Sequence, residues 1–150
     1  MCIIVDTNTF HKFKEPDNED MEPVWTWLEK RDGKIAYADT EKLEDEWDKG
    51  GMQKLRNRLR QTGKLKVVSP EDVQEKADEL KGRIKSDDEH IIALALVAKV
   101  KILISYSDYE SSQTGDQDLF DDFRDKNLVG GRVYTRKAHA RSMLKKDTCP

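Results

Sequence analysis

Short apolar segments alternate with longer amphipathic segments along most of this chain. The apolar segments are continuous rather than alternating, which is typical of strands buried on both faces of a parallel sheet. They predict strands at "CIIV" (2–5), "KIAYAD" (34–39), "LKVVS" (65–69), "KILIS" (101–105) and "RVYT" (132–135). The amphipathic segments between them predict helices near 21–30, 40–50, 51–64, 70–82 and 86–100, with a last basic helix over 136–146.

Capping residues support several of these helices. Thr40 precedes the helix in which Leu43 and Trp47 share one face, and Ser69 with Pro70 forms a favourable helix start. Strands that alternate with helices predict an α/β domain with a mainly parallel, short-stranded sheet. We find no internal repeat and no long linker, and the length suits one hydrophobic core, so residues 1–150 are expected to form a single domain.

Charge is distributed unevenly over the sequence. The formal net charge of −3 argues against a generally basic nucleic-acid coat. The stretch 49–70 nevertheless contains no acid, which favours a surface that faces a polyanion over an ordinary solvated helix face. The residues of this stretch that we expect to contact RNA are Lys54, Arg56, Arg58, Arg60 and Lys64.

Cysteine usage and hydropathy indicate a cytoplasmic protein. Cys2 and Cys149 are the only cysteines, and the first residues lack the basic and long apolar regions of a secretory leader. No apolar run approaches the roughly 18 residues that a membrane helix needs. We therefore expect two free thiols in a reducing compartment and no membrane association.

Acidic residues follow two of the predicted strands. Asp6 ends the first strand, and the acidic stretch 105–123 follows "KILIS". If these strands are neighbours, their carboxyl ends bring the acids together, because open α/β sheets form their ligand sites at that edge. The alternative for Asp6 alone is a helix cap or turn residue.

Two further acids lie on predicted helices. Asp88 precedes Ile91 and Ala95 by three and seven residues, which places it on the buried stripe of its helix, and Glu46 follows Leu43 by three. Carboxylates brought together repel one another unless a cation binds them. Oxygen ligands without His or Cys favour Mg²⁺ or Mn²⁺, which can activate a water for phosphodiester hydrolysis.

These segments together resemble the PIN-domain family. "CIIVDTNTF" is similar to its first strand with Asp and Asn, "KLEDEW" to its helix bearing Glu, and "DEHIIALALVAKVKILIS" to its mid-chain signature. "GDQDLFDDF" resembles the segment after its fourth strand. The resemblance covers roughly residues 2–123 and rests on order and spacing, since no single motif is specific.

The resemblance implies a three-layer α/β/α fold and a single-strand RNA endonuclease with a Mg²⁺ or Mn²⁺ site. When the catalytic positions of the family are matched to this sequence, the resemblance implies that the catalytic acids are Asp6, Glu46, Asp88 and one further aspartate. All of these except Glu46 are expected to bind the metal. Asn8 and Ser105 match polar residues that support the acids.

The fourth acid has two candidates. Asp108 is the candidate by its distance from the end of the predicted strand 101–105. Asp116 is the candidate by local motif, because Thr114-Gly115-Asp116 has the Thr-x-Asp spacing of the family, but it comes after some nine extra residues. Those extra residues favour the alternative hypothesis, a domain of the same fold that has lost catalysis and binds RNA or protein. An active enzyme is either the toxin of a toxin-antitoxin pair, with an antitoxin partner, or a stand-alone RNA-processing nuclease, and the family resemblance also implies a homodimer.

The end of the acidic stretch predicts a short helix rather than a calcium loop. Leu119, Phe120 and Phe123 occupy positions that an EF-hand needs for ligands, and their spacing suits a helix that docks on the core. Its acids Asp121, Asp122 and Asp125 are then expected to face water. His90, two residues after Asp88, is expected at the surface.

Overall fold

A computed structural model of the chain describes residues 2–105 and 114–144, except for the side chains of residues 114–116. The described residues form one five-stranded sheet in which every neighbouring pair is parallel, with the order β3-β2-β1-β4-β5. The strands are β1 (Cys2–Val5), β2 (Lys34–Tyr37), β3 (Leu65–Val67), β4 (Ile102–Ile104) and β5 (Arg132–Tyr134). This arrangement confirms the predicted α/β class and its parallel, short-stranded sheet.

The two strands at the centre of the sheet, β1 and β4, are buried along their whole length. They pair in the register Ile4 to Leu103 and Val5 to Ile104. The edge strand β3 is more exposed, with 44% of Val67 accessible to solvent. Burial on both faces is why the central strands read as unbroken apolar runs in the sequence.

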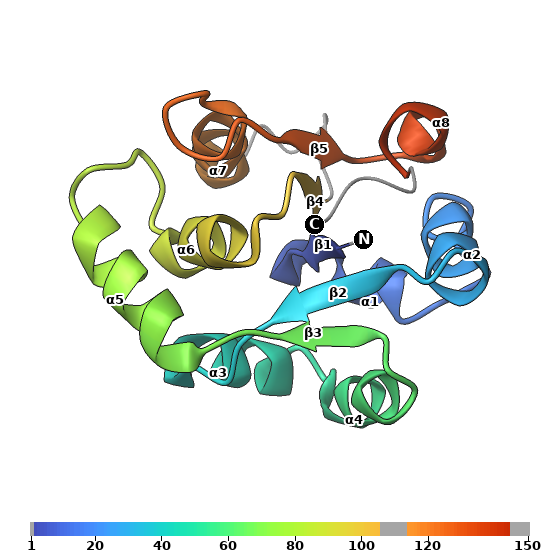
Figure 1. Cartoon of the computed structure of the whole chain (residues 1–150). Helices are drawn as coiled ribbons and strands as arrows, with labels where there is room; N and C mark the ends of the chain where they lie inside the picture. The colour runs from blue at the N-terminus through green and yellow to red at the C-terminus, as the bar shows by residue number, and fades with distance from the viewer. Residues whose placement is uncertain (1, 106–113, 145–150) are drawn as a thin grey trace.

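Helices cover the sheet on both sides, as a three-layer α/β/α fold requires. In Figure 1, α5 and α6 lie on one side of the central strands, while α2 and α8 lie on the other. The described helices are α1 (Phe10–Phe13), α2 (Glu22–Lys30), α3 (Glu41–Lys49), α4 (Gln53–Gln61), α5 (Pro70–Leu80), α6 (Glu89–Ala98), α7 (Thr114–Arg124) and α8 (Ala140–Met143), with 3₁₀ helices η1 (Thr7–Thr9) and η2 (Lys137–His139). None of the helices in the described ranges is long and apolar enough to cross a membrane.

The predicted caps are confirmed. The Thr40 hydroxyl accepts the backbone N–H of Leu43 at 3.2 Å at the start of α3. The Ser69 hydroxyl likewise accepts the N–H of Asp72 at 3.2 Å, and Pro70 begins α5. These bonds satisfy backbone donors that the first helical turn would otherwise leave unpaired.

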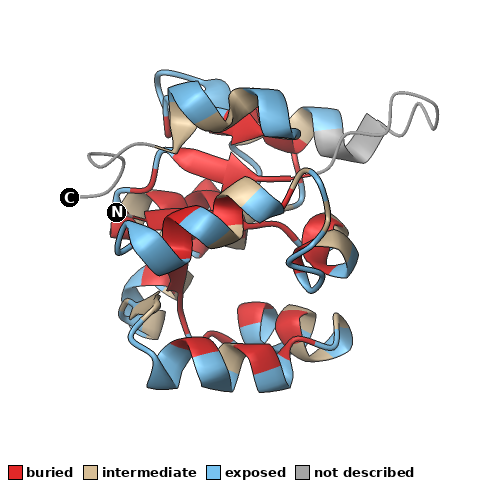
Figure 2. Cartoon of the chain, turned by 90° about the vertical axis from the view of Figure 1, so that its right-hand side faces the viewer, coloured by how far each residue is buried: buried red, intermediate tan, exposed pale blue. Residues whose placement is uncertain are grey.

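The hydrophobic core lies between the sheet and the inward faces of the helices. Figure 2 shows the buried residues concentrated in the central strands and on the inward faces of several helices. Phe123 and Leu119 of α7 are 0% and 1% exposed, which confirms that this helix docks on the core through its apolar residues. Gly131 allows the close approach, because a Cβ there would lie 2.4 Å from the Phe123 ring.

The sequence pattern predicts no element directly after β1, where the chain folds into η1 and α1. These elements are too short for a helical repeat to be detected, although Phe10 and Phe13 are both buried on one face. Two local predictions were wrong. The last basic helix is shorter than predicted, because η2 and α8 replace it over the described residues. Cys2 is buried and disulfide-bonded rather than a free thiol, and the other cysteine, Cys149, lies outside the described residues.

Candidate functional site

The strand order of the sheet reverses between β1 and β4, which makes this a topological switch point. The chain passes from β1 outward to β2 and β3, then crosses back to place β4 and β5 on the other side of β1. At such a switch point the connections leave in opposite directions and open a crevice at the carboxyl ends of the strands. Asp6 follows β1 and Ser105 follows β4, so both lie at this point, and the Asp6 N–H donates to the Ile104 carbonyl at 2.9 Å.

Asp6 is a buried acid whose two carboxylate oxygens have different roles. One oxygen, Oδ1, accepts the backbone N–H of Thr7 at 2.8 Å and thereby caps η1. The other, Oδ2, accepts the hydroxyl of Ser105 at 3.0 Å. Only 5% of Asp6 is exposed, and a carboxylate this buried needs such donors to offset its lost hydration. The capping alternative is therefore correct for Asp6, and the two strands expected to be neighbours do pair, while the acids at 106–113 lie outside the described residues.

Asn8 joins the same cluster. The Ser105 hydroxyl oxygen lies 3.0 Å from Asn8 Oδ1 and equally close to Asp6 Oδ2. A hydroxyl carries one proton, so it donates to one of these two oxygens at a time. The structure thus brings together Asp6, Asn8 and Ser105 from segments about a hundred residues apart, as the sequence predicts.

Asp88 occupies the N-terminal boundary of α6. It is half-buried, and its carboxylate does not cap its own helix, whereas the neighbouring Asp87 is exposed. The Asp88 backbone N–H donates to the Ser86 hydroxyl at 3.3 Å. Asp88 is thus less exposed than Asp87, but it lies one residue before α6 and is half-buried, rather than on the buried stripe of the helix as predicted.

Asp122 corrects the prediction that the acids of α7 all face water. Only 3% of Asp122 is exposed, and its two oxygens accept the backbone N–H groups of Lys85 at 3.1 Å and Ser86 at 2.8 Å. Asp122 follows Leu119 by three residues and so shares the buried face of the helix. The same spacing was available in the sequence, but the run of neighbouring acids concealed it. Asp122 fixes the segment that leads to Asp88.

Glu46 lies on the side of α3 that approaches the start of α6. Its carboxylate is 3.5 Å from the Lys42 amine, and its side chain is 22% exposed. Burial lowers the pKa of His90, and the negative charge of Glu46 is the strongest influence that opposes this shift. His90 is half-buried, with Nε2 3.0 Å from Gln74 Oε1, so the prediction of a surface histidine was wrong. The residue pattern of α6 alone could not show this contact, because Gln74 belongs to a different helix, α5.

The described acids do not by themselves complete a metal site. Within residues 2–105 and 114–144, no three His, Cys, Asp or Glu side chains are grouped so that they could hold an ion. Asp108 lies outside the described residues, and Asp116 belongs to α7 but its side chain is not described. The chemistry of Asp6 and Asp88 suits a hard divalent cation, and a site built on them requires at least one more carboxylate.

Two of the predicted RNA-binding residues are engaged within the fold. Arg56 forms an ion pair with Asp48 at 3.0 Å and donates to the Tyr37 hydroxyl at 3.1 Å, and its side chain is only 12% exposed. Arg60 donates to Asp39 at 3.1 Å and also lies over the Tyr37 ring. These contacts hold α4 against the end of β2.

The other three basic residues line a groove. Lys64 donates to the Leu28 carbonyl at 2.7 Å, so its amine is also fixed, whereas Lys54 and Arg58 are exposed. The groove has a volume of about 390 Å³ and lies between α2, α4 and the segment after α1. Lys54 and Arg58 are therefore the exposed basic residues of this groove, and RNA binding by them stays a prediction.

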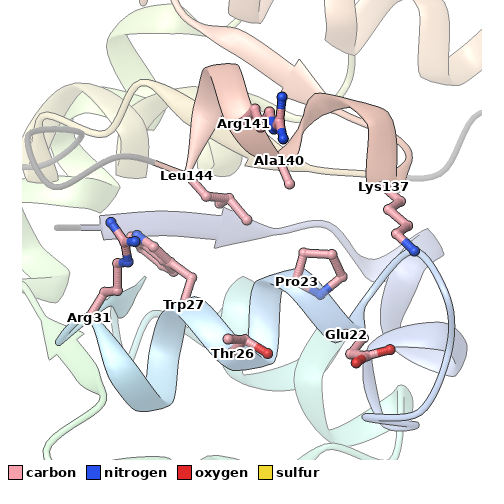
Figure 3. A pocket seen from close by; sticks show the side chains of 9 residues that line it. All are labelled: Glu22, Pro23, Thr26, Trp27, Arg31, Lys137, Ala140, Arg141 and Leu144. Atoms are coloured by element: carbon pink, nitrogen blue, oxygen red, sulfur yellow. The ribbon is translucent and has the colours of Figure 1, made fainter.

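A second cavity, of about 560 Å³, lies between α2 and α8 (Figure 3). Trp27 lines it, and the indole Nε1 of Trp27 is buried without a hydrogen-bond partner in the described part of the chain. The other lining residues are Glu22, Pro23, Thr26, Arg31, Lys137, Ala140, Arg141 and Leu144. The cavity contains none of the Asp6 cluster, and no pattern in the sequence indicates it.

Comparison of the chain with protein-family models, curated proteins and solved structures found no significant match. The resemblance to PIN domains therefore stays a prediction, and function has to be argued from the geometry of the site.

Proposed function

We propose that the chain is a metal-dependent endoribonuclease that hydrolyses phosphodiester bonds of single-stranded RNA. The observation that carries the proposal is the bond between Asp6 and Ser105 at the switch point of the sheet. A buried carboxylate at this position has its orientation fixed by donors from the segments that follow β1 and β4. Such an acid is suited to present an oxygen to a cation or to a substrate in the crevice.

Each residue then has a specific role. Asp6 and Asp88 hold a Mg²⁺ or Mn²⁺ ion together with Asp108 or Asp116, while Ser105 and Asn8 keep the Asp6 carboxylate in place. When bound, a divalent cation polarises a phosphoryl oxygen and lowers the pKa of a coordinated water. Glu46, near the start of α6, serves as the further catalytic carboxylate. The toxin of a toxin-antitoxin pair and a stand-alone processing enzyme both fit this chemistry, and an antitoxin partner and a homodimer remain predictions.

A binding module without catalysis is the second candidate. Two observations favour it: the Glu46 carboxylate is paired with Lys42, and no group of three acids occurs among the described residues. In that case the Asp6 cluster would be a structural feature of the sheet edge.

RNA cleavage distinguishes the two candidates. We would incubate the protein with single-stranded RNA and Mn²⁺ and compare it with the variants Asp6→Asn and Asp88→Asn. Asp87→Asn is the matched control, since it removes the same charge from the adjacent, exposed position. The proposal predicts cleavage by the wild type and by the control only. Cleavage by all four proteins would reject the proposed site, and cleavage by none would favour the binding module.

A further inference from the structure

The groove between α2 and α4 combines a strong positive charge with an aromatic side chain. Among the described residues that line it, four are cationic and one is acidic. These residues are Lys14, Lys54, Arg58 and Lys64, against Glu29. The groove also contains Trp25 and an apolar floor that includes Leu55 and Leu59. Figure 1 shows α2 and α4 on the side of the molecule away from α5 and α6.

Trp25 is held in a fixed position at this groove. Its indole stacks on Phe13 with ring centroids 4.7 Å apart and an angle of 21° between the planes. Its Nε1 donates to the Phe13 carbonyl at 2.8 Å, and the residue remains half-exposed. An aromatic ring that is already ordered loses little entropy when a flat ligand stacks on it.

We propose that this groove binds single-stranded RNA, with a base stacked on Trp25 and phosphates bound by Lys54 and Arg58. The choice of RNA as the substrate rests on the proposed function, but binding in the groove does not depend on cleavage. A cationic groove with an aromatic platform is the usual arrangement for single strands, because any base can stack while the backbone follows the charges. The stacking surface favours RNA over an acidic peptide, which would use the charges alone.

One end of the groove borders the C-terminal end of α3, the helix that carries Glu46. Lys14 donates to the Gly50 carbonyl at 3.2 Å, and the Gly50 N–H donates to the Glu46 carbonyl at 3.0 Å. Gly51, the next residue, lines the groove.

The intrinsic fluorescence of the protein provides a direct test. Trp27 and Trp47 are 3% and 4% exposed, so Trp25 is the tryptophan that a ligand in the groove can reach. Titration of the full chain with a short oligouridylate, in EDTA so that nothing is cut, should quench the fluorescence. In a Trp25→Phe variant, which keeps a ring against Phe13, the quenching should be lost. Unchanged fluorescence in the wild type, or equal quenching in the variant, would overturn the proposal.

Charge variants test the phosphate contacts. The double variant Lys54→Gln/Arg58→Gln should weaken binding of a labelled oligouridylate by about tenfold or more and reduce the slope of log K against log salt by about 1.4, since each phosphate contact on a single strand contributes about 0.7. The control Lys81→Gln/Lys126→Gln removes the same charge from two exposed positions outside the groove and should bind like the wild type. Equal weakening in both would indicate an effect of net charge alone and reject the groove.

Two further outcomes separate this inference from the proposed function. RNA that binds in the groove but is never cleaved supports the groove and contradicts the nuclease. Cleavage that is unaffected by the groove variants supports the nuclease and contradicts the groove. Equal competition by polyglutamate of the same charge would reject RNA in favour of an acidic protein partner.

Discussion

The Oδ2 atom of Asp122 lies 2.8 Å from the backbone nitrogen of Ser86, which is 36 residues earlier in the chain. The Ser86 hydroxyl in turn accepts the backbone N–H of Asp88 at 3.3 Å. A continuous series of hydrogen bonds thus connects α7 to Asp88, the residue that precedes α6. The position of Asp88, a proposed metal ligand, therefore depends on an acid of α7, the helix to which the candidate ligand Asp116 also belongs.

Replacement of Asp122 by alanine should destabilise the fold. The change leaves two backbone donors without their acceptor, which costs about 1–3 kcal/mol for each buried group. Asp121→Ala is the matched control, because the Asp121 side chain is 41% exposed and faces Lys85 at 3.7 Å. Urea denaturation measures both free energies of unfolding. Equal values for the two variants would contradict the structural role of Asp122.

Replacement of Ser105 by alanine tests how the Asp6 carboxylate is held. Loss of the hydroxyl removes one donor to a buried carboxylate, so we expect a loss of about 1–3 kcal/mol in stability. If the proposed function is right, kcat for RNA cleavage should fall while KM changes little, because Ser105 positions Asp6 rather than binding substrate. Ser142→Ala changes an exposed serine and serves as the control. A Ser105→Ala enzyme with an unchanged kcat would show that this bond is not needed for catalysis.

Stability should fall as the pH is lowered through the range of histidine titration. Burial lowers the pKa of His90, and burial together with Arg136 lowers the pKa of His139. Below about pH 6.5 the unfolded chain therefore binds more protons than the folded chain, and protonation favours unfolding. The stabilising contribution is complete above this pH and is lost as the pH falls through the lower, folded-state values.

The variant His90→Asn should make this pH dependence less steep while keeping a polar group near Gln74. Unfolding free energies measured between about pH 5 and pH 7 would show the change in slope. The part that remains includes the contribution of His139. Parallel curves for variant and wild type would mean that His90 does not contribute.

The arginines of α4 should separate into structural and surface residues. Arg56→Gln removes a bond to Asp48 and a bond to Tyr37 from a side chain that is 12% exposed, so we expect a loss of about 1–3 kcal/mol. Arg58→Gln changes an exposed side chain and should leave stability within about 0.5 kcal/mol of the wild type. Thermal denaturation compares the two. Destabilisation by Arg58→Gln as large as that by Arg56→Gln would contradict this division.

Much of the fold follows from local sequence signals. The central strands are recognisable because burial on both faces requires unbroken apolar runs, and the caps at Thr40 and Ser69 act within three residues of themselves. Asp6 could be placed at the site because the carboxyl ends of parallel strands meet at one edge. These predictions need only local sequence and the order of the elements along the chain, and no knowledge of contacts between distant residues.

The errors arise where a residue finds its partner far away in the sequence. Asp122 looked solvated among other acids, yet its partners are backbone groups near residue 86. Arg56 was predicted to contact RNA from its charge alone, and its contact with Tyr37 of β2 could not be read from that pattern. Charge patterns in a sequence show how many charges are present, but which of them are neutralised within the fold is decided by tertiary contacts.

The central claim is that a divalent cation binds at Asp6, and thermal denaturation in the presence of Mn²⁺ tests it most directly. An ion that binds only the folded state at about 100 times its Kd stabilises it by about 2.7 kcal/mol, which corresponds to a rise in Tm of about 5–11 °C for a domain of this size. The rise should occur in the wild type and in Asp87→Asn, and it should be absent in Asp6→Asn. An equal rise in all three proteins, or none in the wild type, would contradict the claim.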